Sequence, residues 1–184
     1  VGISHRGVAY RADDPPLAAW VHNSLTDSFL ACYRAYGARR LSQAEADRFV
    51  REQARIGRLL DADPIPETAD ELSRWVAQHP AVAPSPGMRE AVAFLREPPL
   101  DPAVLFGYRV LASAAIVIIP PQIRQALAIK PRPGARSVGQ ASTTIMRWAL
   151  ANSPRWRQAL LRVDAPIDER LFKQKAPFET LEAA

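Results

Sequence analysis

Cysteine and histidine are scarce in this chain, whose 184 residues include one cysteine and three histidines. The single cysteine, Cys32, excludes an internal disulfide framework and is typical of a protein from a reducing compartment. The histidines are His5, His22 and His79; none belongs to an HExxH motif, and no CxxC motif is present. The sequence therefore argues against a zinc site made of protein ligands alone.

The motifs of common hydrolases and nucleotide-binding enzymes are also missing. The chain has no GxSxG, no P-loop and no GxGxxG sequence. His22 and Asp27 are five residues apart, which is about 140° round a helix, so they cannot form an acid–base dyad within one helix. Any oxidation chemistry would have to come from a bound cofactor.

Long hydrophobic runs are absent as well. The longest uncharged run, residues 110–123, is too short to span a bilayer and contains two consecutive prolines. No signal peptide is recognisable. We therefore expect a cytoplasmic protein.

Acidic residues are few late in the chain, where basic residues gather. The formal net charge is +5. The simplest interpretation of the basic excess is a solvated surface, and the second is peripheral contact with an anionic membrane. Nucleic acid is not an expected partner, because no recognised binding motif accompanies the charge. The basic residues of this segment are Lys130, Arg132, Arg136, Arg147, Arg155, Arg157, Arg162, Arg170, Lys173 and Lys175.

Strand signals are weak, whereas helix starts are well marked. No Asn-Gly or Asp-Gly dipeptide separates alternating apolar runs. Ser42 with Glu45, and Thr68 with Glu71, have the spacing of capping boxes, and Asp-Pro or Ser-Pro pairs begin further helices. We predict an all-α fold, an orthogonal bundle of about seven helices. The helical segments are 14–37, 42–60, 68–79, 85–95, 101–119, 121–129, 137–151 and 154–163.

The segment from Asp14 to Gly37 carries the strongest helix signal, with a capping carboxylate and a proline at its start and a glycine at its end. Its apolar spacing predicts one inward face that includes His22. A buried imidazole needs partners, which a backbone carbonyl, a carboxylate, water or a metal can supply. A structural histidine and a metal ligand therefore both remain open. The predicted inward face consists of Ala18, Val21, His22, Leu25, Phe29, Cys32, Tyr33 and Tyr36.

Two further expectations concern burial. Residues 104–119 are apolar nearly all round, so we predict that they form the central, fully buried helix. His79 precedes a proline at the end of its helix, where we expect it to be exposed. His5, beside a glycine, is the competing ligand candidate. Ile145, Trp148, Trp156 and Leu160 are expected to pack the last two helices.

The sequence YRADDPPLAAWVHNSLTDSFLACYRAYG, followed by LSQAEADRFVREQARIGRLL and IIPPQIRQAL, resembles the family of MpaB-type oxygenases and latex-clearing proteins, the rubber oxygenases. The resemblance runs from His5 to Val163, and its most specific part is the pattern DP…WVH…L…SF on one helix. Members of the family are all-helical, and the latex-clearing branch binds haem b through an axial histidine on the corresponding helix. The resemblance therefore implies haem b as the cofactor, with His22 as the cofactor-binding residue and metal ligand.

The resemblance is closer to the MpaB-type branch. The latex-clearing branch has arginines flanking its histidine, where this chain has Ala19 and Thr26. The family implies an oxidoreductase, a haem-dependent oxygenase that uses dioxygen on an isoprenoid or other lipid-like substrate. Phe29 and Tyr33 lie on the same stripe as His22, where a place in the core is the stronger interpretation and a wall of the haem pocket is the second. The alternative is a non-enzymatic helical module that binds a hydrophobic ligand or partner, in which His22 is structural.

The resemblance also implies that the chain is part of a longer domain. We expect residues 1–163 to be the C-terminal portion of a helical oxygenase-like domain, and residues 164–184 to be a polar tail. The distal pocket residues of the latex-clearing branch lie upstream of Val1. We therefore expect this segment alone to bind haem weakly or not at all, to show no dioxygen-dependent turnover, and to associate with itself through exposed apolar surface.

Overall fold

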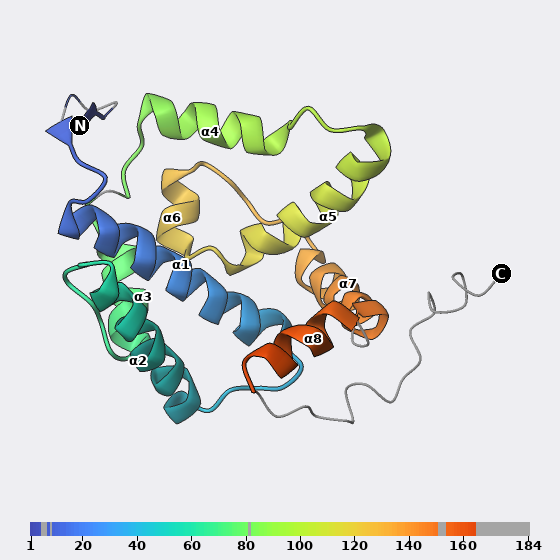
Figure 1. Ribbon diagram of the computed structural model, residues 1–184. Coiled ribbons are helices and arrows are strands. Elements are labelled where there is room, and N and C mark those ends of the chain that lie inside the picture. The colour runs from blue at the N-terminus through green and yellow to red at the C-terminus, as the bar shows by residue number, and fades with distance from the viewer. Residues whose placement is uncertain (5–6, 8, 81, 151–153, 165–184) are drawn as a thin grey trace. The chain divides into compact units, whose positions relative to one another are not determined.

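A computed structural model of the chain describes residues 1–4, 7, 9–80, 82–150 and 154–164. These residues form eight helices and one antiparallel pair of two-residue strands, β1 (Gly2–Ile3) and β2 (Ala9–Tyr10) (Figure 1). The prediction of an all-α fold is confirmed, apart from this small strand pair, which the sequence did not indicate. The helices are α1 (Pro15–Tyr36), α2 (Gln43–Leu59), α3 (Ala69–Gln78), α4 (Pro86–Arg96), α5 (Pro102–Ile118), α6 (Pro121–Ala126), α7 (Ala135–Leu150) and α8 (Pro154–Arg162).

The helix starts follow local chemistry. The Ser42 hydroxyl accepts a hydrogen bond from the Glu45 backbone N–H, and the Glu45 carboxylate accepts one from the Ser42 N–H, so the predicted capping box is present. The Thr68 hydroxyl caps α3 by accepting from the Glu71 N–H, which is one half of the predicted capping box, and the Ser85 hydroxyl caps α4 by accepting from the Met88 N–H. Asp14 occupies the N-cap of α1 without a side-chain hydrogen bond, contrary to the expectation for its carboxylate. There, proline at the first helical position is sufficient for the start.

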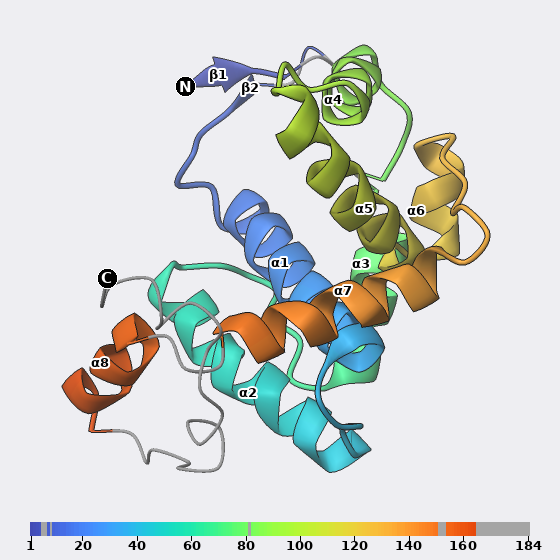
Figure 2. The same cartoon turned by 90° about the vertical axis from the view of Figure 1, so that its right-hand side faces the viewer.

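The chain divides into two compact units, Val1–Arg136 and Ser137–Ala184. The hydrophobic core of the first unit lies between α1, α2 and α3, which Figures 1 and 2 show side by side. Trp20, Trp75 and Phe49 are partly buried and pack against this core. The fully enclosed side chains are Leu30, Ala46, Val50, Ala69, Leu72 and Val76.

The buried face of α1 differs from the predicted one. Val21, Leu25 and Phe29 are about half exposed, and Cys32 is exposed too, so the prediction that they point inward is wrong. Polar residues are buried instead because each has a partner. The Asn23 amide donates to the Pro64 carbonyl over 3.0 Å, and the Thr26 hydroxyl donates to the His22 carbonyl over 2.8 Å. The buried residues of α1 are Ala19, His22, Asn23, Thr26, Asp27, Leu30 and Tyr36.

The prediction for residues 104–119 is also wrong. In α5, Val104 and Phe106 are 57% and 74% exposed, and among its described residues only Ala114 is buried. A helix that is apolar all round needs neighbours all round, whereas the main partner of α5 is α1. The Tyr36 hydroxyl of α1 donates to the Ala114 carbonyl over 2.7 Å and joins the two helices.

The second unit contains α8 and nearly all of α7. Ile145 and Trp148 are 62% and 50% exposed, so the expectation that they pack is wrong. An amphipathic helix buries its apolar face only where a second element covers it. Leu160 is partly buried, whereas the side chain of Trp156 and nearly all of the predicted tail, residues 164–184, lie outside the described residues.

In the described part of the chain, no helix combines the length and the apolarity that a membrane span requires.

Candidate functional site

His22 lies on α1 where α1 meets α2, and only 9% of it is exposed. The Cδ2–Nε2 edge of its ring faces Gly57 of α2. A methyl group placed on Gly57 would stand 2.9 Å from Cδ2 and 3.0 Å from Nε2. Because real side chains do not approach so closely, glycine at position 57 makes room for the imidazole. The prediction that His22 is buried is therefore correct.

Burial also sets the protonation state of His22. Desolvation lowers its pKa below the ordinary value of 6.5, and a hydrogen bond with the backbone of Gln53 partly opposes this shift. At neutral pH the ring is therefore uncharged. A neutral imidazole has one N–H to donate and one nitrogen lone pair to offer, and the backbone bond to Gln53 engages one of the two.

The surface beside His22 is apolar and open. Leu25, Phe29 and Tyr33, one turn apart along α1, are 50%, 59% and 40% exposed. Phe29 and Tyr33 were expected to wall a pocket next to His22. They lie farther along the same helix, about two and three turns from the histidine. Neither of the two most prominent cavities among the described residues is lined by His22, Phe29 or Tyr33.

His79 is packed between two tryptophans, contrary to the expectation that it is exposed. Its ring stacks on Trp20 at 4.5 Å between ring centres and lies 4.6 Å from Trp75 in a tilted arrangement. Burial lowers its pKa. His79 does end α3 as predicted, but the neighbouring tryptophans cover it. His5, the competing ligand candidate, lies outside the described residues.

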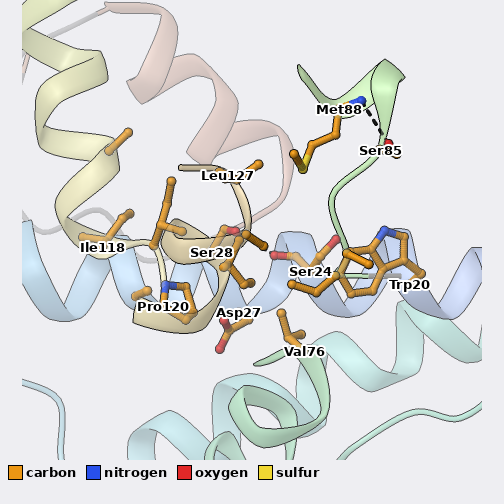
Figure 3. A pocket seen from close by; sticks show the side chains of 17 residues that line it. Trp20, Ser24, Asp27, Ser28, Val76, Ser85, Met88, Ile118, Pro120 and Leu127 are labelled. Carbon is orange, nitrogen blue, oxygen red and sulfur yellow. Dashed lines mark hydrogen bonds between the residues drawn. The ribbon is translucent and has the colours of Figure 1, made fainter. Parts of the chain in front are cut away.

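A cavity of about 480 Å³ lies on another side of α1. Figure 3 shows Ser24 and Ser28 of α1 in its middle, with Trp20 at one end and Ile118 and Pro120 at the other. Its size is within the range of pockets that hold small molecules. The full lining is Trp20, Ser24, Asp27, Ser28, Ala31, Val76, Val82, Ala83, Ser85, Met88, Ala115, Ile118, Ile119, Pro120, Ile123, Ala126 and Leu127.

Asp27 is a buried carboxylate at the edge of this cavity, with 6% of the residue exposed. Its Oδ1 accepts a hydrogen bond of 2.6 Å from the Ser73 hydroxyl of α3. The structure keeps Asp27 and His22 on different faces of α1, as their spacing predicts. The two do not form one site.

Sequence reasoning found His22 but missed the cavity. Ser24, Asp27 and Ser28 have i, i+3, i+4 spacing, which marks a polar stripe on an otherwise apolar helix. This polar stripe is a signal from which a cavity could have been predicted. The neighbouring apolar stripe was instead taken as the buried face of the helix. Across the described residues, no three His, Cys, Asp or Glu side chains gather as a metal-binding group. A haem iron needs only one axial protein ligand, so this does not bear on His22.

Comparison with known proteins gives one match. A family model described as ER-bound oxygenase mpaB/B'/rubber oxygenase, catalytic domain, matches residues 1–149. No curated protein and no solved structure matches the chain. The matched range includes α1, the His22 contact with α2 and the complete lining of the cavity.

Proposed function

We propose that this chain, which belongs to the mpaB/rubber oxygenase family of catalytic domains, is part of a haem-dependent oxygenase that acts on a hydrophobic substrate. The family is one of oxygenase catalytic domains, and this assigns the chain to oxidoreductase chemistry. Haem b, dioxygen and an isoprenoid or other lipid-like substrate are the finer parts of the proposal. The observation that carries it is a neutral, buried histidine on the helix with the most specific family pattern.

The surroundings of His22 fit an axial ligand in two respects. The imidazole is neutral, as metal ligation requires. The backbone of Gln53 holds the ring, which is how metal-bound histidines are commonly oriented. At the Cδ2–Nε2 edge, Gly57 of α2 lies against the ring, and its missing side chain makes room for the imidazole itself. We therefore propose His22 as the residue that would hold haem.

The other residues near His22 suit a supporting role. A bound haem would supply the dioxygen chemistry, which none of the described side chains can perform. Leu25 and Phe29 expose an apolar surface on the same side of α1, which would exclude water and accept a hydrophobic molecule. Asn23 ties α1 to the loop after α2 through Pro64, and this fixes the helix that carries the histidine.

The test is the visible absorption spectrum of the natural full-length protein, purified with haem. We expect a Soret band that is lost or strongly shifted in His22→Ala. His79→Ala is the matched control, because it removes a second partly buried imidazole that faces Trp20 and Trp75, and its spectrum should be unchanged. An unchanged spectrum in His22→Ala would overturn the assignment of the ligand, and full-length protein without any Soret band would overturn haem dependence.

Peripheral contact with an anionic membrane is a further part of the proposal. It is supported by exposed apolar and basic residues in the second unit, where Ile145 and Trp148 flank Arg147 on α7. Co-sedimentation with vesicles of phosphatidylcholine containing about a third of phosphatidylserine tests it. Binding that disappears at high salt supports an electrostatic contact, and equal binding to pure phosphatidylcholine argues against one.

A non-enzymatic module that binds a hydrophobic ligand is the second candidate function. The cavity between α1, α3, α5 and α6 favours it, because this cavity is built without His22. Full-length protein that lacks haem but binds apolar molecules would be the outcome that selects this alternative.

A further inference from the structure

We propose that the cavity between α1, α3, α5 and α6 is a second ligand site, separate from His22, and that it takes a small apolar primary alcohol with its hydroxyl directed at α1. This goes beyond the oxygenase function, because it requires neither haem nor turnover. Nothing in the family description assigns a ligand to these residues. The shape of the cavity and the hydrogen bonds of its polar groups both favour such a ligand.

The body of the cavity is apolar. Val76 comes from α3, Ile118 and Ile119 from the end of α5, and Ile123 and Leu127 from α6 and its C-cap. Burying an apolar chain against these side chains gains about 25 cal/mol per Å² of surface removed from water. In Figure 3, Val76 lies on one side and Met88 on the other. The cavity therefore suits an unbranched or lightly branched hydrocarbon chain.

The side chains of Ser24, Asp27 and Ser28 offer oxygen acceptors to this cavity, whereas Trp20 of the same helix adds an indole N–H donor. The Ser24 hydroxyl donates to the Val21 carbonyl over 3.1 Å, and the Ser28 hydroxyl donates to the Ser24 carbonyl over 2.7 Å. The Oδ1 atom of Asp27 already accepts from the Ser73 hydroxyl. Toward a ligand, these three side chains offer oxygen lone pairs.

A ligand that complements these three side chains must bring a hydrogen-bond donor, and a hydroxyl can in addition accept from the Trp20 indole N–H or from the Ser85 hydroxyl. A carboxylate would place acceptors against acceptors and a negative charge against Asp27. An ammonium would have to lose the hydration of a full charge beside a carboxylate that is already hydrogen-bonded, which is costly in an apolar cavity. A hydroxyl supplies the donor without a charge. Across the cavity, Ser85 accepts from the Met88 N–H at the start of α4 and defines the opposite side.

The cavity and His22 are on separate faces of α1. Ser24, Asp27, Ser28 and Ala31 repeat at i, i+3, i+4 and i+7, so they form one stripe, and His22 does not belong to it. His22 contacts Gly57 of α2, whereas α2 contributes no residue to the cavity. Ligand binding at the two places can therefore be measured independently.

The test is isothermal titration calorimetry of the full chain with three eight-carbon probes, octan-1-ol, its isomer heptyl methyl ether, and octanoate. The ether has the size of the alcohol but lacks the donor. We expect octan-1-ol to bind at least about tenfold more tightly than either of the others, as a hydrogen bond to a charged acceptor predicts. Equal binding of alcohol and ether, tighter binding of octanoate, or no binding of the alcohol would each overturn the proposal.

Variants locate the site. Ala126→Phe places a ring in the cavity and should abolish alcohol binding, while Ala93→Phe, on the exposed side of α4, should leave it unchanged. In Asp27→Asn, the amide oxygen still accepts from Ser73, but an amide NH₂ group, which is a donor, replaces the other carboxylate oxygen. Octan-1-ol should therefore no longer bind more tightly than the ether. An advantage that persists in Asp27→Asn would overturn the role of α1. Circular dichroism and thermal melting show whether each variant is folded.

A last variant separates this site from the proposed haem site. His22→Gln removes the imidazole but reaches nothing in the cavity, so the affinity for octan-1-ol should stay within about twofold of the parent chain. Loss of alcohol binding in this variant would place the ligand at His22 and overturn the separate site. Absence of haem from the protein, in contrast, would leave the calorimetric result unaffected.

Discussion

The α1–α3 core and the α4–α5 segment differ in a way that their composition does not predict. α5 is the more apolar element, yet Ala114 is the only one of its described residues that is buried, whereas the charged helix α2 buries Ala46, Val50, Ala54 and Gly57. α2 has one narrow apolar side, and α1 and α3 cover it. The apolar character of α5 has no comparable cover among the described residues. A helix face is therefore buried only where another element packs against it. The apolar content of the helix determines how much stability such packing would add.

The largest expected effect is on the core itself. Leu72 of α3 is 1% exposed, and Leu72→Ala should lower the free energy of unfolding by about 2–4 kcal/mol, because it leaves a cavity among α1, α2 and α3. Leu111 of α5 is 47% exposed, and Leu111→Ala should cost less than about 1 kcal/mol. Urea unfolding followed by circular dichroism measures both. Similar losses for the two variants would show that α5 is packed as tightly as the core.

Substitution of two glycines by alanine should change stability in opposite directions in the core and in α5. Nothing lies within 4 Å of a Cβ placed on Gly107 of α5, so Gly107→Ala should raise the free energy of unfolding by about 0.5–1 kcal/mol through helix propensity. A Cβ on Gly57 would stand 2.6 Å from the Ile65 Cδ1 atom and 2.9 Å from His22. Gly57→Ala should therefore lower the free energy of unfolding, because overpacking costs about 1–3 kcal/mol and outweighs the gain in helix propensity. Thermal unfolding should move in opposite directions for the two variants. A stabilised Gly57→Ala would mean that the His22 ring is free to move away.

The helix starts provide a smaller comparison. Ser42→Ala removes a complete capping box and should cost about 1 kcal/mol. Asp101 stands at the equivalent position of α5 but makes no side-chain capping bond, and Asp101→Ala should change the free energy of unfolding by less than about 0.5 kcal/mol. Urea unfolding measures both changes. Equal losses of unfolding free energy in Ser42→Ala and Asp101→Ala would show that side-chain capping does not distinguish the start of α2 from the start of α5.

The smallest effect is the pH dependence of stability between pH 5 and 8. The folded chain holds the pKa of His22 and His79 below 6.5, so both histidines favour the folded state in their neutral form. Their contribution is complete above pH 6.5 and is lost as the pH falls through their folded pKa values. Thermal melting should therefore drop on acidification, and less steeply in His22→Gln. A melting temperature that rises on acidification over this range would contradict the burial of both rings.

The sequence predicted the local features of the fold well. Seven of the helix starts follow from proline or from side-chain caps, and the Ser42 capping box forms as its spacing indicates. These features depend on neighbours within four residues, which the sequence displays directly. The burial of His22 was also predicted correctly, although most of the apolar stripe from which it was predicted is exposed.

The faces that helices present to one another were predicted poorly. Val21, Leu25 and Phe29 form a regular apolar stripe, and the sequence alone gives no reason to leave it exposed. The buried side of α1 is chosen by partners distant in sequence, such as Pro64 for Asn23 and Ser73 for Asp27. The cavity was not predicted either, because its walls come from five segments that meet only in the folded chain.

The central claim is that His22 is the protein's own ligand to haem, and restoration of that ligand from solution tests it most directly. In the full-length protein, His22→Gly removes the imidazole and leaves space beside Gln53 and Gly57 that a free imidazole can enter. The absorption spectrum should lose the Soret band of the parent protein in His22→Gly and regain it when millimolar imidazole is added, while the same addition to His79→Gly changes nothing. A His22→Gly protein whose spectrum already equals that of the parent, before any imidazole is added, would contradict the claim.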